Sequence, residues 1–107
     1  MTLVEQIYKQ GHKMNSFPFK LYHLDTKGEN QIIISIPKRL FKRAVKRNLL
    51  RRRTREAIRA LRSEYPIISQ KDILLVYISP NILEYGEIKQ GLANTFGKIP
   101  QVAQENA

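Results

Sequence analysis

Residues 42–62 read KRAVKRNLLRRRTREAIRALR, and two helical patterns overlap in this stretch. A helix turns by about 100° per residue, which brings apolar and small residues together on one side. That side carries Leu50, Thr54, Ala57, Ile58, Leu61 and Tyr65. Such a stripe is typical of a helix that docks on a sheet. We expect the helix to begin between Phe41 and Val45 and to end near Ser63.

The second pattern is a row of basic residues beside the stripe. The row contains Asn48, Arg51, Arg52, Arg55, Arg59 and Arg62. Like charges three and four residues apart repel one another on an isolated helix, and ordinary solvated helices dilute them with acids. Arginine also exceeds lysine in this row, and its planar guanidinium can bind two phosphate oxygens at once. The undiluted row therefore favours a polyanion-binding surface over a merely solvated face.

The charge of the whole chain is concentrated in the same region. The net charge is +10, but residues 38–62 hold twelve Lys or Arg and one acid, a local charge of +11. The remaining residues carry seven bases and eight acids, a charge of −1. A membrane-surface helix is disfavoured because its apolar stripe is needed for the core. Nucleic acid is the favoured partner.

RNA fits better than duplex DNA. A helix-turn-helix needs a short helix directly upstream of its recognition helix, whereas a strand and Pro37 precede this one. RNA and single strands are bound by basic rows combined with aromatic stacking platforms. Tyr8 and Tyr22 are candidate platforms, although a tyrosine on a half-buried strand more often packs than stacks. A non-catalytic RNA-binding protein, such as a ribosomal component, and a DNA-binding protein remain alternatives.

The remaining segments predict a small α+β sandwich formed by one domain over residues 1–107. The expected elements are a helix at 2–10 ended by Gly11, strands at 17–24 and 31–36, a buried central strand at 72–79, and a last helix after Asn81. Residues 25–30 predict a turn with Lys27-Gly28 at its tip, so the first two strands should pair as an antiparallel hairpin. Residues 101–107 predict a frayed tail.

Two alternating faces and one helical stripe give the expected packing. In the first strand Phe17, Phe19 and Leu21 share the core face, while Lys20 and Tyr22 share the other. In the last helix the apolar stripe is Tyr85, Ile88, Leu92, Phe96 and Ile99.

The sequence offers little catalytic chemistry of its own. The nine acids are scattered, and none forms an obvious pair for two-metal phosphoryl chemistry. We interpret His12 and His23 as surface side chains. The chain has no cysteine, no apolar run of membrane-spanning length and no signal-peptide core. We expect a cytoplasmic binding protein without catalytic or metal-ligating residues.

The segment AVKRNLLRRRTREAIRAL resembles the RNR-motif helix of the bacterial ribonuclease P protein subunit. That motif runs Arg-Asn-Arg, a hydrophobe, two bases, two further residues and Arg. The matching residues are Arg47, Asn48, Leu50, Arg51, Arg52 and Arg55. Four other segments resemble family segments and keep the family's order along the chain. They are IYKQG (7–11), FKLYHL (19–24), SIPKR (35–39) and LEYGEIKQGLANTF (83–96). The chain departs from the pattern at the third motif position, which is Leu49 instead of Arg. The family's RNA contact at that position is either absent or supplied by Arg53. The chain also departs at LFKR (40–43), which replaces the glycine-bearing turn usual before the helix.

The resemblance implies a fold and a role. The fold would be a two-layer sandwich like domain 2 of ribosomal protein S5, with a small four-stranded sheet and a left-handed β-α-β crossover. The protein would bind the catalytic RNA and the 5′ leader of precursor tRNA, and it would assist removal of that leader as a subunit of an endoribonuclease. The RNA would carry the catalytic chemistry and hold most of the Mg²⁺, and no protein partner would be required. The implied RNA-binding residues are Lys38, Arg39, Arg47, Asn48, Arg51, Arg52, Arg55 and Arg59. The implied leader cleft contains Val4, Tyr8, Lys20 and Tyr22.

Overall fold

The computed structural model describes residues 2–25 and 31–99, which form three α-helices, a short 3-10 helix and four strands. In chain order they are α1 (Leu3–Gln10), β1 (His12–Ser16), β2 (Phe19–Asp25), β3 (Ile32–Ser35), α2 (Ala44–Leu61), η1 (Pro66–Gln70), β4 (Lys71–Tyr77) and α3 (Tyr85–Gly97). The α+β class and the positions of the helices are as predicted. The predicted turn at Lys27-Gly28 and the predicted tail at 101–107 lie outside the described residues.

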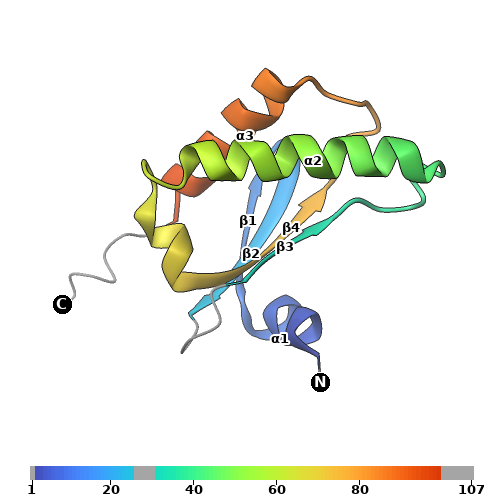
Figure 1. Ribbon diagram of the computed structural model, residues 1–107. Helices are drawn as coiled ribbons and strands as arrows, with labels where there is room; N and C mark the ends of the chain where they lie inside the picture. Colours follow the sequence, from blue (N-terminus) through green and yellow to red (C-terminus); the bar gives the residue numbers. More distant parts are fainter. Residues whose placement is uncertain (1, 26–30, 100–107) are drawn as a thin grey trace.

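The four strands form one sheet in the order β1-β2-β4-β3 (Figure 1). β2 pairs antiparallel with β1 and with β4, while β3 pairs parallel with β4. The expected hairpin between β2 and β3 is therefore wrong, because β4 lies between them. β3 is left at one edge of the sheet, and the unpredicted β1 forms the other.

The chain passes from β3 through α2 to the neighbouring parallel strand β4, which makes a β-α-β unit. The handedness of this crossover stays a prediction of the resemblance. α2 and α3 lie together over one face of the sheet, and α1 packs on part of the opposite face (Figure 1). The two faces of the sheet therefore differ in how completely they are covered.

The main core lies between the sheet and the α2–α3 pair. Phe19 and Leu21 of β2 are fully buried there, as predicted, and β4 is buried on both faces. The stripe of α3 is also confirmed, with Ile88, Leu92 and Phe96 fully buried. Phe17, expected on the core face, is 63% exposed. It lies two residues before the start of β2 at Phe19, so the alternation of the strand does not reach it.

α1 is fixed at both ends by local contacts. Thr2 and Glu5 form a reciprocal capping box at its start. Gly11 ends the helix, as predicted, and a Cβ at this position would lie 2.5 Å from the Ile7 carbonyl oxygen and 2.9 Å from that of His23. Glycine is therefore required by the close approach of α1 to β2. This contact sets where α1 sits on its face of the sheet.

Candidate nucleic-acid interface

α2 buries the predicted stripe against the sheet and α3. Leu50, Thr54, Ala57, Ile58 and Leu61 are each at most 5% exposed, and Tyr65, just after the helix, is half-buried. The hydroxyl of Thr54 donates to the Leu50 carbonyl oxygen at 2.8 Å, so this buried polar group is satisfied within the helix. This docking fixes the rotation of α2 about its axis, and the basic row consequently faces outward.

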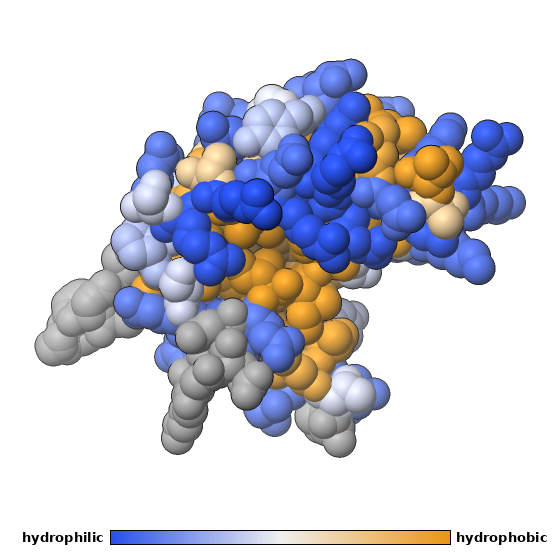
Figure 2. All heavy atoms as spheres, in the orientation of Figure 1, coloured by the Kyte–Doolittle hydropathy of each residue, from blue (hydrophilic) through white to orange (hydrophobic). Residues whose placement is uncertain are grey.

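Three arginines of the row have free guanidinium groups. Arg52, Arg55 and Arg59 are exposed and have no hydrogen-bond or ion-pair partner within residues 2–25 and 31–99. Their neighbour Asn48 is exposed and accepts a long 3.4 Å hydrogen bond from Arg51. Figure 2 shows the hydrophilic side chains gathered over α2. Unpaired guanidinium groups so close together repel one another, and an anionic partner would relieve that repulsion.

Two other arginines of α2 are held by the chain itself. Arg47 donates from one terminal nitrogen to the carbonyl oxygens of Phe41 and Lys42, at 2.8 and 2.9 Å. It therefore braces the loop before α2, where Arg43 gives no side-chain cap. A role for Arg47 in RNA binding stays a prediction, but the residue also has this structural contact.

Arg53 points to the opposite side of the helix from the open row. Its guanidinium donates to the Leu83 carbonyl oxygen at 2.6 Å and lies 3.8 Å from the Glu84 carboxylate. These contacts tie α2 to the segment before α3. Arg53 therefore has a structural role, and whether it also supplies the RNA contact expected at the position of Leu49 stays a prediction.

Lys38 and Arg39 lie in the exposed turn that links β3 to α2. The backbone amides of Leu40 and Phe41 both donate to the Pro37 carbonyl oxygen, at 3.1 and 3.3 Å. Phe41 is only 6% exposed and anchors the turn in the core. The two cations are thereby placed between the end of β3 and the start of α2, and the basic surface extends from the helix to the sheet edge.

A second candidate surface lies on the face of the sheet that α1 covers in part. The strand register aligns Asn15, Lys20, Val76 and Ser35 in one row across all four strands. None of these residues is fully buried. The predicted position of Lys20 on the face away from the main core is confirmed, because Tyr22, two residues on, packs with Ile7 of α1.

The two tyrosines of this surface differ strongly in exposure. Tyr22 is 8% exposed and packs with Ile7 and Leu74, while Tyr8 is 61% exposed. Their ring centroids are 5.1 Å apart with an interplanar angle of 44°. Burial raises the pKa of the Tyr22 hydroxyl, and the adjacent Tyr8 adds to this effect. Tyr22 is thus a packing residue that supports Tyr8, and Tyr8 offers the accessible ring.

Val4 completes the set of residues implied for the leader cleft. It is 40% exposed and lies one helical turn before Tyr8. The structure therefore brings Val4, Tyr8, Lys20 and Tyr22 to the same side of the sheet. Their contact with RNA stays a prediction.

His23 corrects the expectation that both histidines lie at the surface. His12 is exposed, but His23 is 5% exposed, and its Nδ1 has no hydrogen-bond partner in the described part of the chain. Burial, followed by the positive charges of Lys71 and His12, lowers the pKa of His23 to about 4. Lys71 also pairs with Asp25 and holds the pKa of that carboxyl below its usual value. His23 follows Phe19 and Leu21 at the two-residue spacing of β2, so the alternation of the strand already places it on the buried face, and this signal was missed.

The described residues contain no group of three or more His, Cys, Asp or Glu side chains placed to hold a metal ion. The candidate interface is lined by cations and amides, and this set of donors does not fit Mg²⁺, which prefers oxygen ligands. In the same part of the chain, no helix is long and apolar enough to cross a bilayer.

The fold and its basic face define a small α+β protein suited to a polyanionic partner. The sequence matches the model of the Ribonuclease P family over residues 3–100, and the chain belongs to that family of ribonuclease P protein subunits. Membership connects the chain with tRNA processing and implies an RNA partner. No match was found among curated proteins.

Solved structures agree with this assignment. The RNase P protein of Staphylococcus aureus superposes with a TM-score of 0.74 at 27% identity, over 90% of this chain and 89% of that one. An S. aureus variant described as defective in mRNA degradation superposes with a TM-score of 0.71 at 25% identity, over 94% of this chain and 81% of that one. The RNase P protein of Thermotoga maritima gives 0.78 at 19% identity over 91% of both chains, which supports the fold alone.

Proposed function

We propose that this protein binds the catalytic RNA of ribonuclease P through the exposed side of α2 and assists removal of the 5′ leader from precursor tRNA. The observation that carries the proposal is the set of unpaired guanidinium groups of Arg52, Arg55 and Arg59 in a member of this family. Asn48, Arg51, Lys38 and Arg39 extend the cationic and polar surface on either side. Guanidinium groups bind phosphate oxygens in pairs, so this side of α2 suits the backbone of a folded RNA.

The α1 face would bind the leader. Tyr8 offers an exposed ring on which a base can stack, and Lys20 offers a charge for the backbone. A single-stranded leader needs both kinds of contact, because its bases are unpaired and its phosphates are charged. The protein would thereby hold the substrate near the catalytic RNA and raise its affinity.

The chemistry of phosphodiester hydrolysis would belong to the RNA. Mg²⁺ would be held mainly by that RNA and would supply Lewis-acid activation of the reacting oxygens. The residues of this chain would bind and orient the RNA, and no second protein would be required. The complex would act where these RNAs occur, in the cytoplasm of a bacterium.

A reconstitution assay tests the proposal. Cleavage of a precursor tRNA by the ribonuclease P RNA of the same organism is measured at low Mg²⁺, with and without the protein. We expect marked stimulation, which should shrink as Mg²⁺ is raised and as the leader is shortened. Absence of stimulation, together with stable co-sedimentation with ribosomes, would instead support the non-catalytic alternative.

A further inference from the structure

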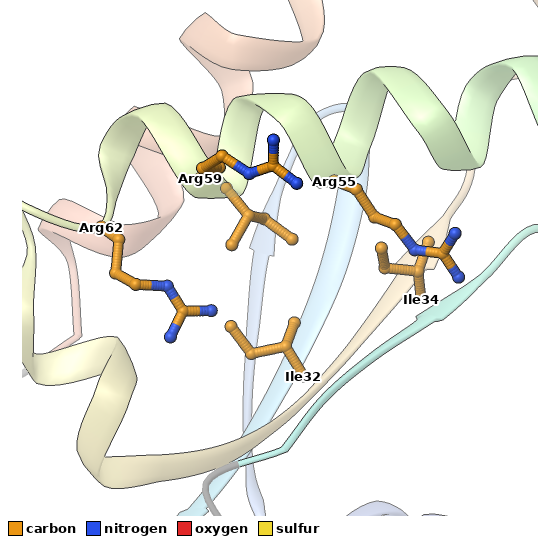
Figure 3. A pocket seen from close by; sticks show the side chains of 6 residues that line it. Ile32, Ile34, Arg55, Arg59 and Arg62 are labelled. Atoms are coloured by element: carbon orange, nitrogen blue, oxygen red, sulfur yellow. The ribbon is translucent and has the colours of Figure 1, made fainter.

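A groove runs between α2 and the edge strand β3 at the open side of the main core. Six residues line it: Ile32, Ile34, Arg55, Ile58, Arg59 and Arg62. Its volume is 260 Å³, below the roughly 300–1,000 Å³ of pockets for drug-sized ligands. In Figure 3 the two isoleucines of β3 form one side, and the labelled arginines extend over them from α2. The groove is therefore small, apolar on its floor and cationic along its rim.

The rim is not neutralised by the protein itself. Arg55 and Arg59 have no partner within the described ranges, and Arg62 makes only a 3.4 Å hydrogen bond to the Ser69 hydroxyl. On the other side β3 is the last strand of the sheet. The outer backbone groups of an edge strand have no ladder partner and can bind a ligand.

The floor is apolar and open to solvent. Ile32 and Ile34 are half-buried on the side of β3 that packs against the main core. In Figure 2 a hydrophobic area lies directly beneath the hydrophilic band of α2. A ligand for this groove must therefore combine a compact apolar face with adjacent negative charge.

We propose that the groove holds one unstacked nucleotide of the partner RNA, with its base against Ile32 and Ile34 and its flanking phosphates on Arg55 and Arg59. A nucleotide has the required flat apolar base and charged phosphate, and proteins bind RNA most specifically at such unpaired bases. The groove continues the basic row of α2, which favours RNA over an acidic peptide. The inference rests on the proposed function and adds a base-binding site to it.

The test uses two isoleucines of one strand. Ile32→Ser removes one of the two β3 isoleucines that form the floor of the groove. Ile33→Ser is the matched control, because Ile33 is also half-buried but its side chain packs on the α1 side of the sheet. Affinity for the ribonuclease P RNA is measured over a range of salt, and base reactivity along the RNA is mapped with each protein. Thermal unfolding checks that both variants fold.

We expect Ile32→Ser to bind the RNA about tenfold more weakly with an unchanged salt slope. One unpaired nucleotide should lose its protection with this variant and keep it with Ile33→Ser. An abasic substitution at that nucleotide should weaken wild-type binding about tenfold and weaken Ile32→Ser no further. The abasic measurement with the wild-type protein does not depend on whether the protein variant folds.

Equal affinity of the two serine variants, or no nucleotide whose protection depends on Ile32, would overturn the inference. If Arg59→Gln weakened binding while Ile32→Ser did not, the arginines would contact phosphates beside an empty groove. The base-binding inference would then be wrong, and the proposed function would remain supported. Failure of the wild-type protein to bind the RNA would overturn both the proposed function and the base-binding groove. Binding of an acidic peptide with RNA affinity unaffected by Ile32→Ser would also overturn it.

Discussion

Replacement of the open arginines by glutamine should change how RNA affinity depends on salt. Arg52, Arg55 and Arg59 have no partner among the described residues, so each is available for a phosphate. Each lost phosphate contact removes about 0.7 to 0.9 from the slope of log affinity against log salt. The triple glutamine variant should therefore lose about 2 to 3 units of slope. Between 0.1 and 0.3 M salt, wild-type affinity should fall roughly 10- to 20-fold more than that of the variant.

The control for this experiment is Arg53→Gln, which removes one positive charge from the same helix, as each substitution of the triple variant does. Arg53 donates to the Leu83 carbonyl oxygen at 2.6 Å, and its side chain is 22% exposed. We expect Arg53→Gln to lower the free energy of unfolding by about 1.5–3 kcal/mol and to leave the salt slope unchanged. Filter binding gives the slopes and denaturant titration gives the stabilities. Equal slopes for wild type and the triple variant would refute the assignment of the row to phosphate contact.

Three further outcomes are expected. Tyr8→Ala should weaken binding of precursor tRNA relative to mature tRNA by about 1–3 kcal/mol if a leader base stacks on the ring. An equal loss of affinity for both tRNAs would show that Tyr8 does not contact the leader. Tyr22→Ala should mainly lower the free energy of unfolding, by about 3 kcal/mol. Gly91→Ala should lower the melting temperature, because its Cβ would clash with the Pro18 ring. Because burial lowers the pKa of His23, the folded state disfavours its protonated form. The free energy of unfolding should therefore be highest above pH 6.5 and should fall by up to about 3 kcal/mol between pH 6.5 and pH 4. In His23→Asn this pH dependence should be absent.

The helices and their buried faces could be predicted because their signals are local. The spacing of Leu50, Thr54, Ile58 and Leu61 depends only on the helical repeat, and the same holds for the stripe of α3. The continuous apolar run of β4 likewise predicts a strand covered on both faces. These elements place the basic row at the surface, and this part of the candidate site follows from sequence.

Strand pairing could not be predicted because it depends on contacts distant in the chain. β1 reads HKMNS, which has neither apolar alternation nor β-branched residues. β2 and β3 are close in sequence and suggest a hairpin, yet β4 lies between them. The row of Asn15, Lys20, Val76 and Ser35 and the groove at the β3 edge both result from this order, so neither was visible beforehand.

The arginines of α2 show how structure changes the meaning of a charge pattern. In the sequence, the helical repeat places Arg59 in the basic row and leaves Arg47 and Arg53 outside it, but it does not show what each guanidinium contacts. In the structure, Arg47 braces the loop before the helix, Arg53 ties α2 to the segment before α3, and Arg59 remains unpaired among the described residues. A cation that already donates to a backbone carbonyl gains less from a phosphate than an unpaired one, because the existing hydrogen bond must be given up or shared. RNA affinity should therefore depend on the angular position of each arginine around α2 more than on the number of arginines.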